Sequence, residues 1–126
     1  MNSGYTIRGA ISVKENSEKA IVSATKELFS CIIENNHLQQ DDIESILFSA
    51  TKDLTTAYPA VAIRELGFTE VTMMCFQEMD VENSLPMCIR MFLMTKETIE
   101  DRKHVYLHDA KKLRPDWVEE VQSGNN

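Results

Sequence analysis

The chain has 126 residues, of which 43% are apolar and 26% are charged, and its formal net charge is −7 at pH 7. This length suits one domain with a single core, and the acidic balance disfavours nucleic acid and anionic membranes as partners. No apolar run approaches the roughly 20 residues of a membrane span, and the N-terminus lacks the features of a secretory signal.

The N-terminal half predicts a strand, a long helix and a second strand. Residues 6–13, TIRGAISV, favour a strand in which Gly9 permits a close backbone approach or a bulge. Asn16 or Ser17 can cap the next helix, where apolar residues recur at helical spacing for roughly five turns. SILFSA, residues 45–50, predicts a short buried strand.

The C-terminal half predicts a short helix and further strands. Residues 51–56 form a polar turn, and Pro59 and Gly67 suit the first turn and the C-terminal cap of a helix that contains AVAIREL. The apolar runs at 71–76 and 87–95 do not alternate cleanly, so we expect two strands that are buried on both faces.

The last predicted strand is HVYLH, residues 104–108, which alternates and places His104, Tyr106 and His108 on one face. The two histidines are splayed in a strand and have no convincing third ligand nearby. We therefore expect surface histidines and no metal site. The segment AKKL that follows predicts a final turn.

Together these elements predict one domain over residues 1–126, in which residues 116–126 form a flexible polar tail. The order of strands and helices predicts an α+β fold, with a mixed five-stranded sheet and helices packed on one face. We find no internal repeat and no linker between domains.

One arginine stands out because Arg90 is the only charge between Met87 and Thr95. A lone guanidinium in such a run is costly to bury without a partner, and Glu78 follows the preceding apolar run. The two charges form either a structural ion pair or part of a ligand pocket. The guanidinium fork suits carboxylates, and four arginines lie beside apolar or turn residues: Arg8, Arg64, Arg90 and Arg114.

The cysteines Cys31, Cys75 and Cys88 are odd in number and have no CxxC spacing, which predicts reduced thiols in a cytoplasmic protein. No Cys/His signature accompanies Cys75, so we expect a core or pocket-wall residue rather than a nucleophile. The sequence contains no GxGxxG, P-loop or GxSxG motif that would indicate a dinucleotide, a nucleoside triphosphate or a hydrolase triad.

Several short motifs stand in an order and spacing typical of one family, and in combination they are highly specific. They are IRGA (7–10), SATKD (49–53), YPAVAIREL (58–66), CFQEMDV (75–81), LPMCIR (85–90), HVYL (104–107) and LRPD (113–116). From about residue 6 to residue 116 the chain resembles the monofunctional bacterial chorismate mutases of the trimeric pseudo-α/β-barrel class.

The resemblance implies a homotrimer whose active sites lie in clefts between neighbouring subunits. It also implies the Claisen rearrangement of chorismate to prephenate, the committed step toward phenylalanine and tyrosine. No metal, cofactor or covalent intermediate is implied by this resemblance.

The resemblance further implies roles for individual residues. Arg90 would donate to the ether oxygen and a carboxylate of the substrate, and Glu78 would accept from the ring hydroxyl. Arg8 and Tyr106 would bind substrate carboxylates, and Cys75 would contact the hydroxyl side. The remaining substrate-binding residues would be Tyr58 and Ala60 of the neighbouring subunit, Arg64 near the cleft mouth, Met74 in the wall, and Leu113 and Arg114 of the C-terminal segment.

Two positions depart from the family's usual pattern. Val61 stands where the family often has a lysine, and Met74 stands where it often has a threonine. We expect weaker capture of substrate rather than lost chemistry. Two other functions stay open at this point: a non-catalytic trimeric protein that binds a small dicarboxylate, and an imine deaminase of similar trimeric shape.

Overall fold

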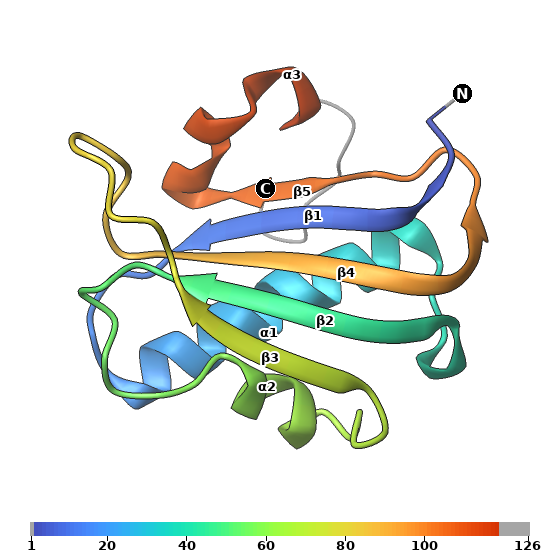
Figure 1. The fold of residues 1–126 in the computed structure, drawn as a ribbon, viewed down its shortest axis with the longest axis horizontal. Coiled ribbons are helices and arrows are strands. Elements are labelled where there is room, and N and C mark those ends of the chain that lie inside the picture. Colours follow the sequence, from blue (N-terminus) through green and yellow to red (C-terminus); the bar gives the residue numbers. More distant parts are fainter. Residues whose placement is uncertain (1, 119–126) are drawn as a thin grey trace.

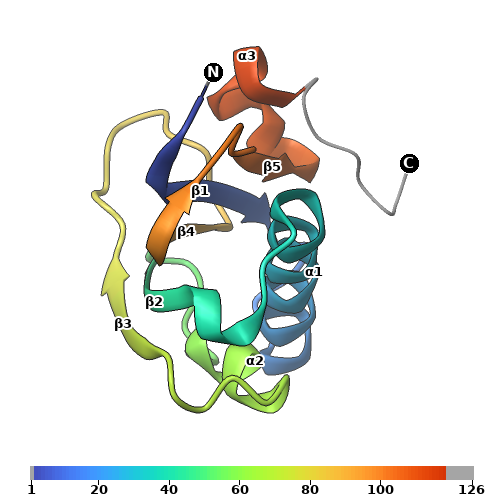
Figure 2. The same ribbon diagram turned by 90° about the vertical axis from the view of Figure 1, so that its right-hand side faces the viewer.

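The computed structural model describes residues 2–118, which form a five-stranded mixed sheet with helices against one face (Figures 1 and 2). The strands are β1 (Gly4–Ser12), β2 (Ile43–Ala50), β3 (Thr72–Gln77), β4 (Cys88–Ile99) and β5 (Val105–Leu107), and the helices are α1 (Glu18–Asn36), α2 (Ala60–Glu65) and α3 (Pro115–Val118). No helix in this part of the chain has the length and apolar character needed to cross a membrane.

The strands lie in the order β3-β2-β4-β1-β5. The central strand β4 runs antiparallel to both β1 and β2, whereas β3 is parallel to β2 and β5 is parallel to β1. The predicted α+β class with a mixed five-stranded sheet is therefore confirmed, and α1 and α2 lie together behind the sheet in Figure 1.

Helix α1 begins where the sequence predicts, because the hydroxyl of Ser17 accepts a hydrogen bond from the backbone N–H of Ala20 at 3.1 Å. Glu18 in the first turn adds a favourable charge at the positive end of the helix dipole. The helix ends at His37, which adopts a left-handed conformation with φ of 53°. Its inner face presents Ile21 and Leu28, both fully buried, to the sheet.

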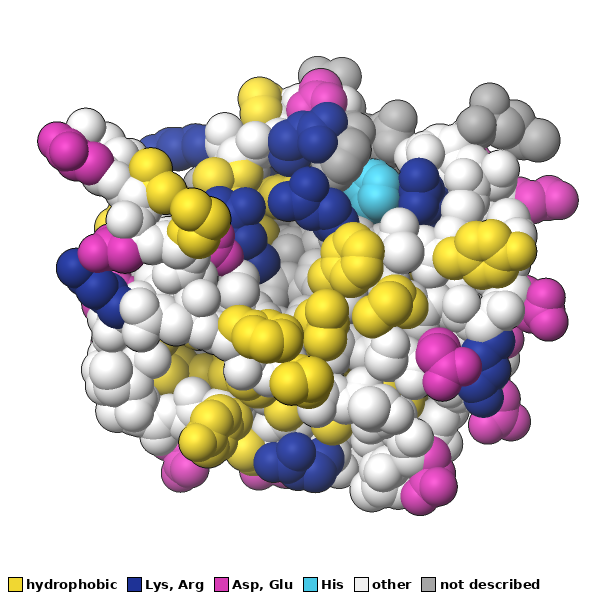
Figure 3. Space-filling model, viewed as in Figure 1, with side chains coloured by type: hydrophobic (Ala, Val, Ile, Leu, Met, Phe, Trp, Pro, Cys, Tyr) yellow, Lys and Arg dark blue, Asp and Glu magenta, His cyan; other side chains and the backbone are white. Residues whose placement is uncertain are grey.

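The opposite face of the sheet, here called the open face, carries no helix over most of its area. On the helix side Ile46, Phe48 and Leu93 are buried, whereas on the open face Phe76 is 50% exposed and Phe92 is 36% exposed. The prediction that the strands at 71–76 and 87–95 are buried on both faces is therefore wrong for the single chain. Their apolar residues on the second face have no covering layer within it, and they form the apolar patch in Figure 3.

Gly9 confirms the predicted close approach of backbones. It pairs with Val105 where β5 joins β1 in parallel, and its position is fully packed. A Cβ added there would lie 2.9 Å from the carbonyl oxygen of Val105 and 3.0 Å from a methyl group of Ile32. The glycine therefore allows α1 and β5 to pack against β1 at one point.

The C-terminal segment differs from its prediction in three places. The last strand is Val105–Leu107 rather than 104–108, because His108 turns into a left-handed conformation with φ of 55° and starts a 3-10 helix, His108–Leu113. The prediction that His104 is at the surface is wrong, since it is 4% exposed. Of the predicted tail, Asp116 to Val118 belong to α3, and residues 119–126 lie outside the described residues.

We expect Gly9→Ala to lower the free energy of unfolding by about 1–3 kcal/mol, because the added methyl group meets a backbone oxygen that cannot move alone. Chemical denaturation monitored by circular dichroism would measure this. Gly4→Ala is the comparison, since its methyl group would meet the guanidinium of Arg102, the far end of a flexible side chain. Equal losses in the two variants would contradict the packing role of Gly9.

Candidate active site

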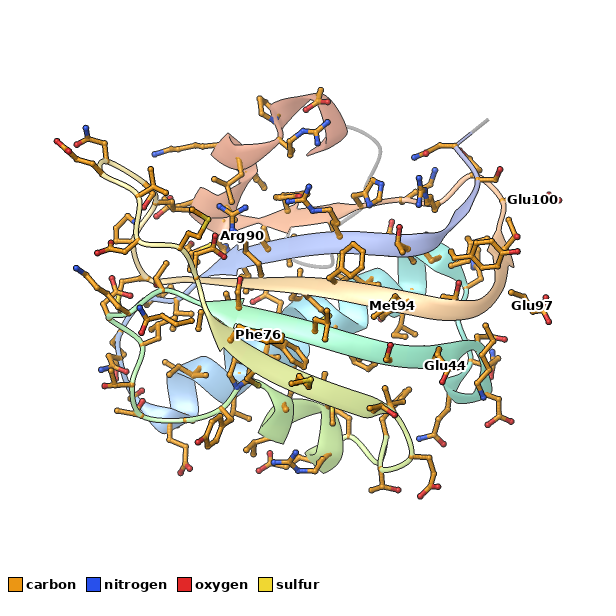
Figure 4. The ribbon with its side chains drawn as sticks, viewed as in Figure 1. Glu44, Phe76, Arg90, Met94, Glu97 and Glu100 are labelled. Atoms are coloured by element: carbon orange, nitrogen blue, oxygen red, sulfur yellow. The ribbon has the colours of Figure 1, made fainter. Side chains whose placement is uncertain are left out.

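A hollow of about 390 Å³ lies on the open face, near the end of the sheet where β3 gives way to the loop before β4. Its lining includes the three charged residues that the sequence analysis placed in one site, Arg8, Glu78 and Arg90. Figure 4 shows Arg90 and Phe76 on this face, close to the same end of the sheet.

Strand register explains why these residues meet. Arg90 of β4 pairs with Ser49 of β2 on one side and with Ala10 of β1 on the other, and paired residues project from the same face. Arg8, two residues before Ala10 on β1, projects from that face as well. Glu78 follows β3 directly, and its backbone N–H donates to the carbonyl of Ala50 at 2.9 Å.

Arg90 and Glu78 form an ion pair in which Nε of the arginine lies 3.4 Å from Oε1 of the glutamate. Both side chains are about two-thirds or more buried, with exposed fractions of 32% and 25%. The Nε atom is nevertheless buried without a hydrogen-bond partner among the described residues. A buried donor of this kind carries a desolvation cost, which an oxygen acceptor on a ligand would remove.

Ser49 is a functional candidate that the sequence analysis did not single out. Its hydroxyl donates to Oε1 of Glu78, the same oxygen that faces Arg90. The hydrogen bond from Ser49 and the ion pair with Arg90 therefore meet at one oxygen of the Glu78 carboxylate. The only sequence indication was its place in the motif SATKD, to which no role was attached.

Tyr106 lies beside this hollow, buried at 3% exposure in a small cluster with Ala10 and Cys88. Burial raises the pKa of the Tyr106 phenol, while the positive charges of Arg8, Arg90 and Arg114 act in the opposite direction. The charges of three arginines, on β1, β4 and the C-terminal segment, therefore act on one phenol, with Asp116 opposing them, and Figure 3 shows basic side chains gathered above the apolar patch. Such a cluster suits an anion with more than one carboxylate.

The neighbouring side chains of the cluster are themselves buried. Burial raises the pKa of the Cys88 thiol to about 11, and the nearby positive charge of Arg90 only partly opposes this. Leu113 packs against the same cluster, which puts it next to Tyr106. Arg114 forms an ion pair with Asp116 at 2.8 Å.

A second hollow, of about 590 Å³, lies next to the first and shares Phe48 and Phe76 with it. Tyr58, Val61 and Cys75 line it, and Tyr58 is 70% exposed. Cys75 faces the helix side of the sheet, where it packs against the core. The predicted site is thus divided between two adjacent surfaces of the single chain.

The predicted site residues therefore fall into two groups. The first group lies in or beside the charged hollow: Arg8, Glu78, Arg90, Tyr106, Leu113 and Arg114. The second group lies outside that hollow: Tyr58 and Cys75 line the second one, Ala60 is buried on α2, Arg64 is exposed on α2, and Met74 is exposed on β3.

His104 joins the site through the backbone of Arg8, whose N–H donates to Nδ1 of the histidine at 2.9 Å. The ring must be neutral at Nδ1 to accept this hydrogen bond. Burial, and to a smaller extent the positive charges of Arg102, Arg8 and Arg114, lower the pKa of His104 to about 4. The strand that carries Arg8 is thus tied to a histidine that resists protonation.

The chain is similar to known proteins of one family. Residues 5–117 match the family model for chorismate mutase type I, and the chain belongs to that family. It is 42% identical over 113 residues to chorismate mutase AroH of Bacillus subtilis (strain 168). This match covers 87% of the present chain and 89% of the relative. It is also 42% identical over 113 residues to chorismate mutase AroH of Thermus thermophilus, and this match covers 87% of the present chain and 93% of the relative.

A solved structure is also similar to this fold. The chorismate mutase from Clostridium thermocellum superposes with a TM-score of 0.82 at 43% identity, covering 86% of this chain and 99% of that one. The family resemblance predicted from the short motifs is confirmed by these findings.

We expect the stability of the folded chain to fall by about 2 kcal/mol as pH drops from 6.5 to 4.5 because of His104. The unfolded chain takes up this proton near pH 6.5, whereas the folded chain does so only near pH 4, so acid favours unfolding between these values. His104→Asn, whose amide oxygen can still accept from Arg8, should reduce this pH dependence. Urea denaturation at several pH values would measure it.

His37→Asn is the matched control, because His37 is exposed and lies at the end of α1. This variant should keep the pH dependence of the wild-type chain. An unchanged pH dependence in His104→Asn would contradict the assignment.

Proposed function

We propose that the chain is a chorismate mutase that rearranges chorismate to prephenate in the biosynthesis of phenylalanine and tyrosine. Membership of the chorismate mutase type I family supports this proposal. The single structural observation that carries it is the largely buried pair of Arg90 and Glu78, in which the buried Nε of the arginine lacks a hydrogen-bond partner among residues 2–118. That donor is available to an oxygen of the substrate.

The chemistry fits a site of fixed charges. In a Claisen rearrangement the ether C–O bond breaks as the new C–C bond forms, and no proton has to move. Negative charge builds on the ether oxygen and partial positive charge on the ring fragment. Catalysis then depends on holding the reactive conformer and on placing charges where charge develops.

Arg90 supplies the positive charge at the ether oxygen. Its partly buried position on the open face, beside Phe92 in the hollow, strengthens the interaction because the local dielectric is lower than that of water. Glu78 accepts from the ring hydroxyl and offsets the guanidinium when no substrate is bound. Ser49 keeps the carboxylate of Glu78 in one orientation through its hydrogen bond.

The two substrate carboxylates require the other cations. Arg8 and the Tyr106 phenol bind one of them, and Arg114 closes over the site from the C-terminal segment together with Leu113. The ion pair between Arg114 and Asp116 is exposed, so a carboxylate of the substrate can replace Asp116 at little cost.

We also propose that the protein is a homotrimer in the cytoplasm, with each site completed by a neighbouring subunit. The exposed aromatic and methionine side chains on the open face support an interface there. The division of predicted site residues between two hollows supports a cleft in which the charged hollow of one chain meets the wall that carries Tyr58, Ala60 and Arg64 in the next. Cys75 and Met74 belong to that wall region.

Loss of the diene absorbance of chorismate in the presence of purified protein tests the function. We expect Arg90→Lys to lower kcat by at least ~10²-fold, since a flexible ammonium cannot reproduce the preset donor. Lys96→Arg, at an exposed position on β4, is the control and should keep full activity. If the wild-type protein binds chorismate but leaves it unchanged, the chain is a non-catalytic binding protein and the proposal is wrong.

We expect Phe92→Asp to dissociate the trimer, because it places a charge in the apolar patch that the neighbouring subunit covers. Size-exclusion chromatography with light scattering would then report the mass of one chain, and chorismate turnover would fall in parallel. Ser23→Asp, at an exposed position on α1, should remain trimeric. A wild-type protein that is monomeric at micromolar concentration would contradict the proposed assembly.

A further inference from the structure

The segment that follows β2 holds the start of β4 by side-chain hydrogen bonds. The hydroxyl of Thr51 accepts from the backbone N–H of Cys88 at 3.0 Å, and the N–H of Thr51 donates to the carbonyl of Cys88 at 3.0 Å. The same hydroxyl donates to Oδ1 of Asp53 at 2.5 Å, which fixes its direction. Thr51 therefore extends the pairing of β2 with β4 to Cys88, which is two residues before Arg90.

Asp53 binds the backbone of Met87, the residue before Cys88. Its two carboxylate oxygens accept from the backbone N–H of Met87 at 3.0 and 3.2 Å. Met87 has a left-handed backbone with φ of 51°, a conformation that a non-glycine residue keeps only when its surroundings hold it. The carbonyl of Met87 accepts from the N–H of Val13 at 2.7 Å, so the residue is fixed on both sides.

The same short segment also holds the partner carboxylate. Ser49 donates its hydroxyl to Glu78, and the carbonyl of Ala50 accepts from the N–H of Glu78 at 2.9 Å. Residues 49–53, the motif SATKD, thus contact both the strand that carries Arg90 and the residue that pairs with it. The separation between the two charges is set by this one segment.

We propose that Thr51 and Asp53 are positioning residues that set the placement of Arg90 through the backbone of Met87 and Cys88. This inference rests on the proposed function. Neither side chain lines the charged hollow that Arg90 and Glu78 share, whereas Thr51 lines the second hollow. Their effect reaches the reaction because a displacement of the order of 1 Å at a preset charge lowers the rate substantially.

Thr51→Val tests the first residue, because it removes the hydroxyl and keeps the shape of the side chain. We expect kcat for chorismate to fall about tenfold with KM changed less than about twofold, since the binding of the ground state is spared. Thr51→Ser restores the hydroxyl and should recover kcat to within about twofold. Thr98→Val, an exposed threonine at the far end of β4, is the matched control and should keep the wild-type kcat.

Asp53→Asn tests the second residue, because it removes the negative charge with little change of shape. Asp41→Asn, at an exposed site, is the control. We expect a similar fall in kcat, together with faster hydrogen–deuterium exchange of the Met87 and Cys88 amides in the whole protein. Exchange in α1 should be unchanged. The exchange experiment measures the contact without relying on turnover.

A double-mutant cycle between Thr51 and Arg90 separates an effect on the position of Arg90 from an effect on general stability. In an Arg90→Lys background, Thr51→Val should lower kcat by less than about twofold, because the placement that it disturbs has already been lost. Equal effects of Thr51→Val in both backgrounds would overturn the proposal, as would unchanged kcat or unchanged amide exchange in Thr51→Val and Asp53→Asn. A wild-type protein without mutase activity would instead overturn the proposed function, while the amide exchange would still report the contact itself.

Discussion

The pairing of Arg90 with Glu78 is the interaction on which the site depends. A guanidinium that is two-thirds buried on an apolar sheet needs a countercharge, and Glu78 supplies it at 3.4 Å without satisfying the buried Nε donor. Glu78 therefore compensates the charge of Arg90, but the Nε donor still lacks a hydrogen-bond acceptor among the described residues. A ligand oxygen next to Nε would supply the missing acceptor, and this is the basis of the proposed role of the pair in catalysis.

The sheet supports this arrangement because its two faces differ. The helix side holds a continuous core in which Ile7, Phe48 and Ile89 are essentially inaccessible, and this core fixes the strand positions. The open face has apolar residues but no covering layer in the single chain, and the charged hollow lies at its edge. A second subunit over that face would bury the patch and supply the missing wall of the site. In the proposed trimer, assembly and chemistry would therefore depend on the same surface.

Local features of the sequence predicted local structure well. The Ser17 cap and the apolar period of α1 depend on residues a few positions apart, and Gly9 marks a close approach because it has no side chain, although its contacts are distant in the sequence. The pairing of Glu78 with Arg90 could be a structural ion pair or part of a ligand pocket. A single charge in an apolar run indicates that the charge is buried, but it does not distinguish these two roles. The proximity of Arg8 and Tyr106 followed from the family resemblance, and strand register explains it physically.

Features that arise from long-range packing could not be predicted from the sequence. The run MCIRMFLMT is apolar on both faces, although one of these faces is uncovered in the single chain, and the proposed trimer would account for this. His104 looked like a surface residue because nothing near it in the sequence indicates that it accepts a hydrogen bond from Arg8. The contacts of Thr51 and Asp53 with Cys88 and Met87 join segments more than thirty residues apart, beyond the range of any local pattern.

The most direct test of the central claim is a crystal structure of the protein with a bicyclic transition-state analogue bound. We expect the analogue in the charged hollow, with its ether oxygen within hydrogen-bond distance of the Arg90 guanidinium and its hydroxyl against Glu78. A second chain should close the cleft with Tyr58. An analogue bound elsewhere, or an Arg90 side chain turned away from it into solvent, would contradict the account.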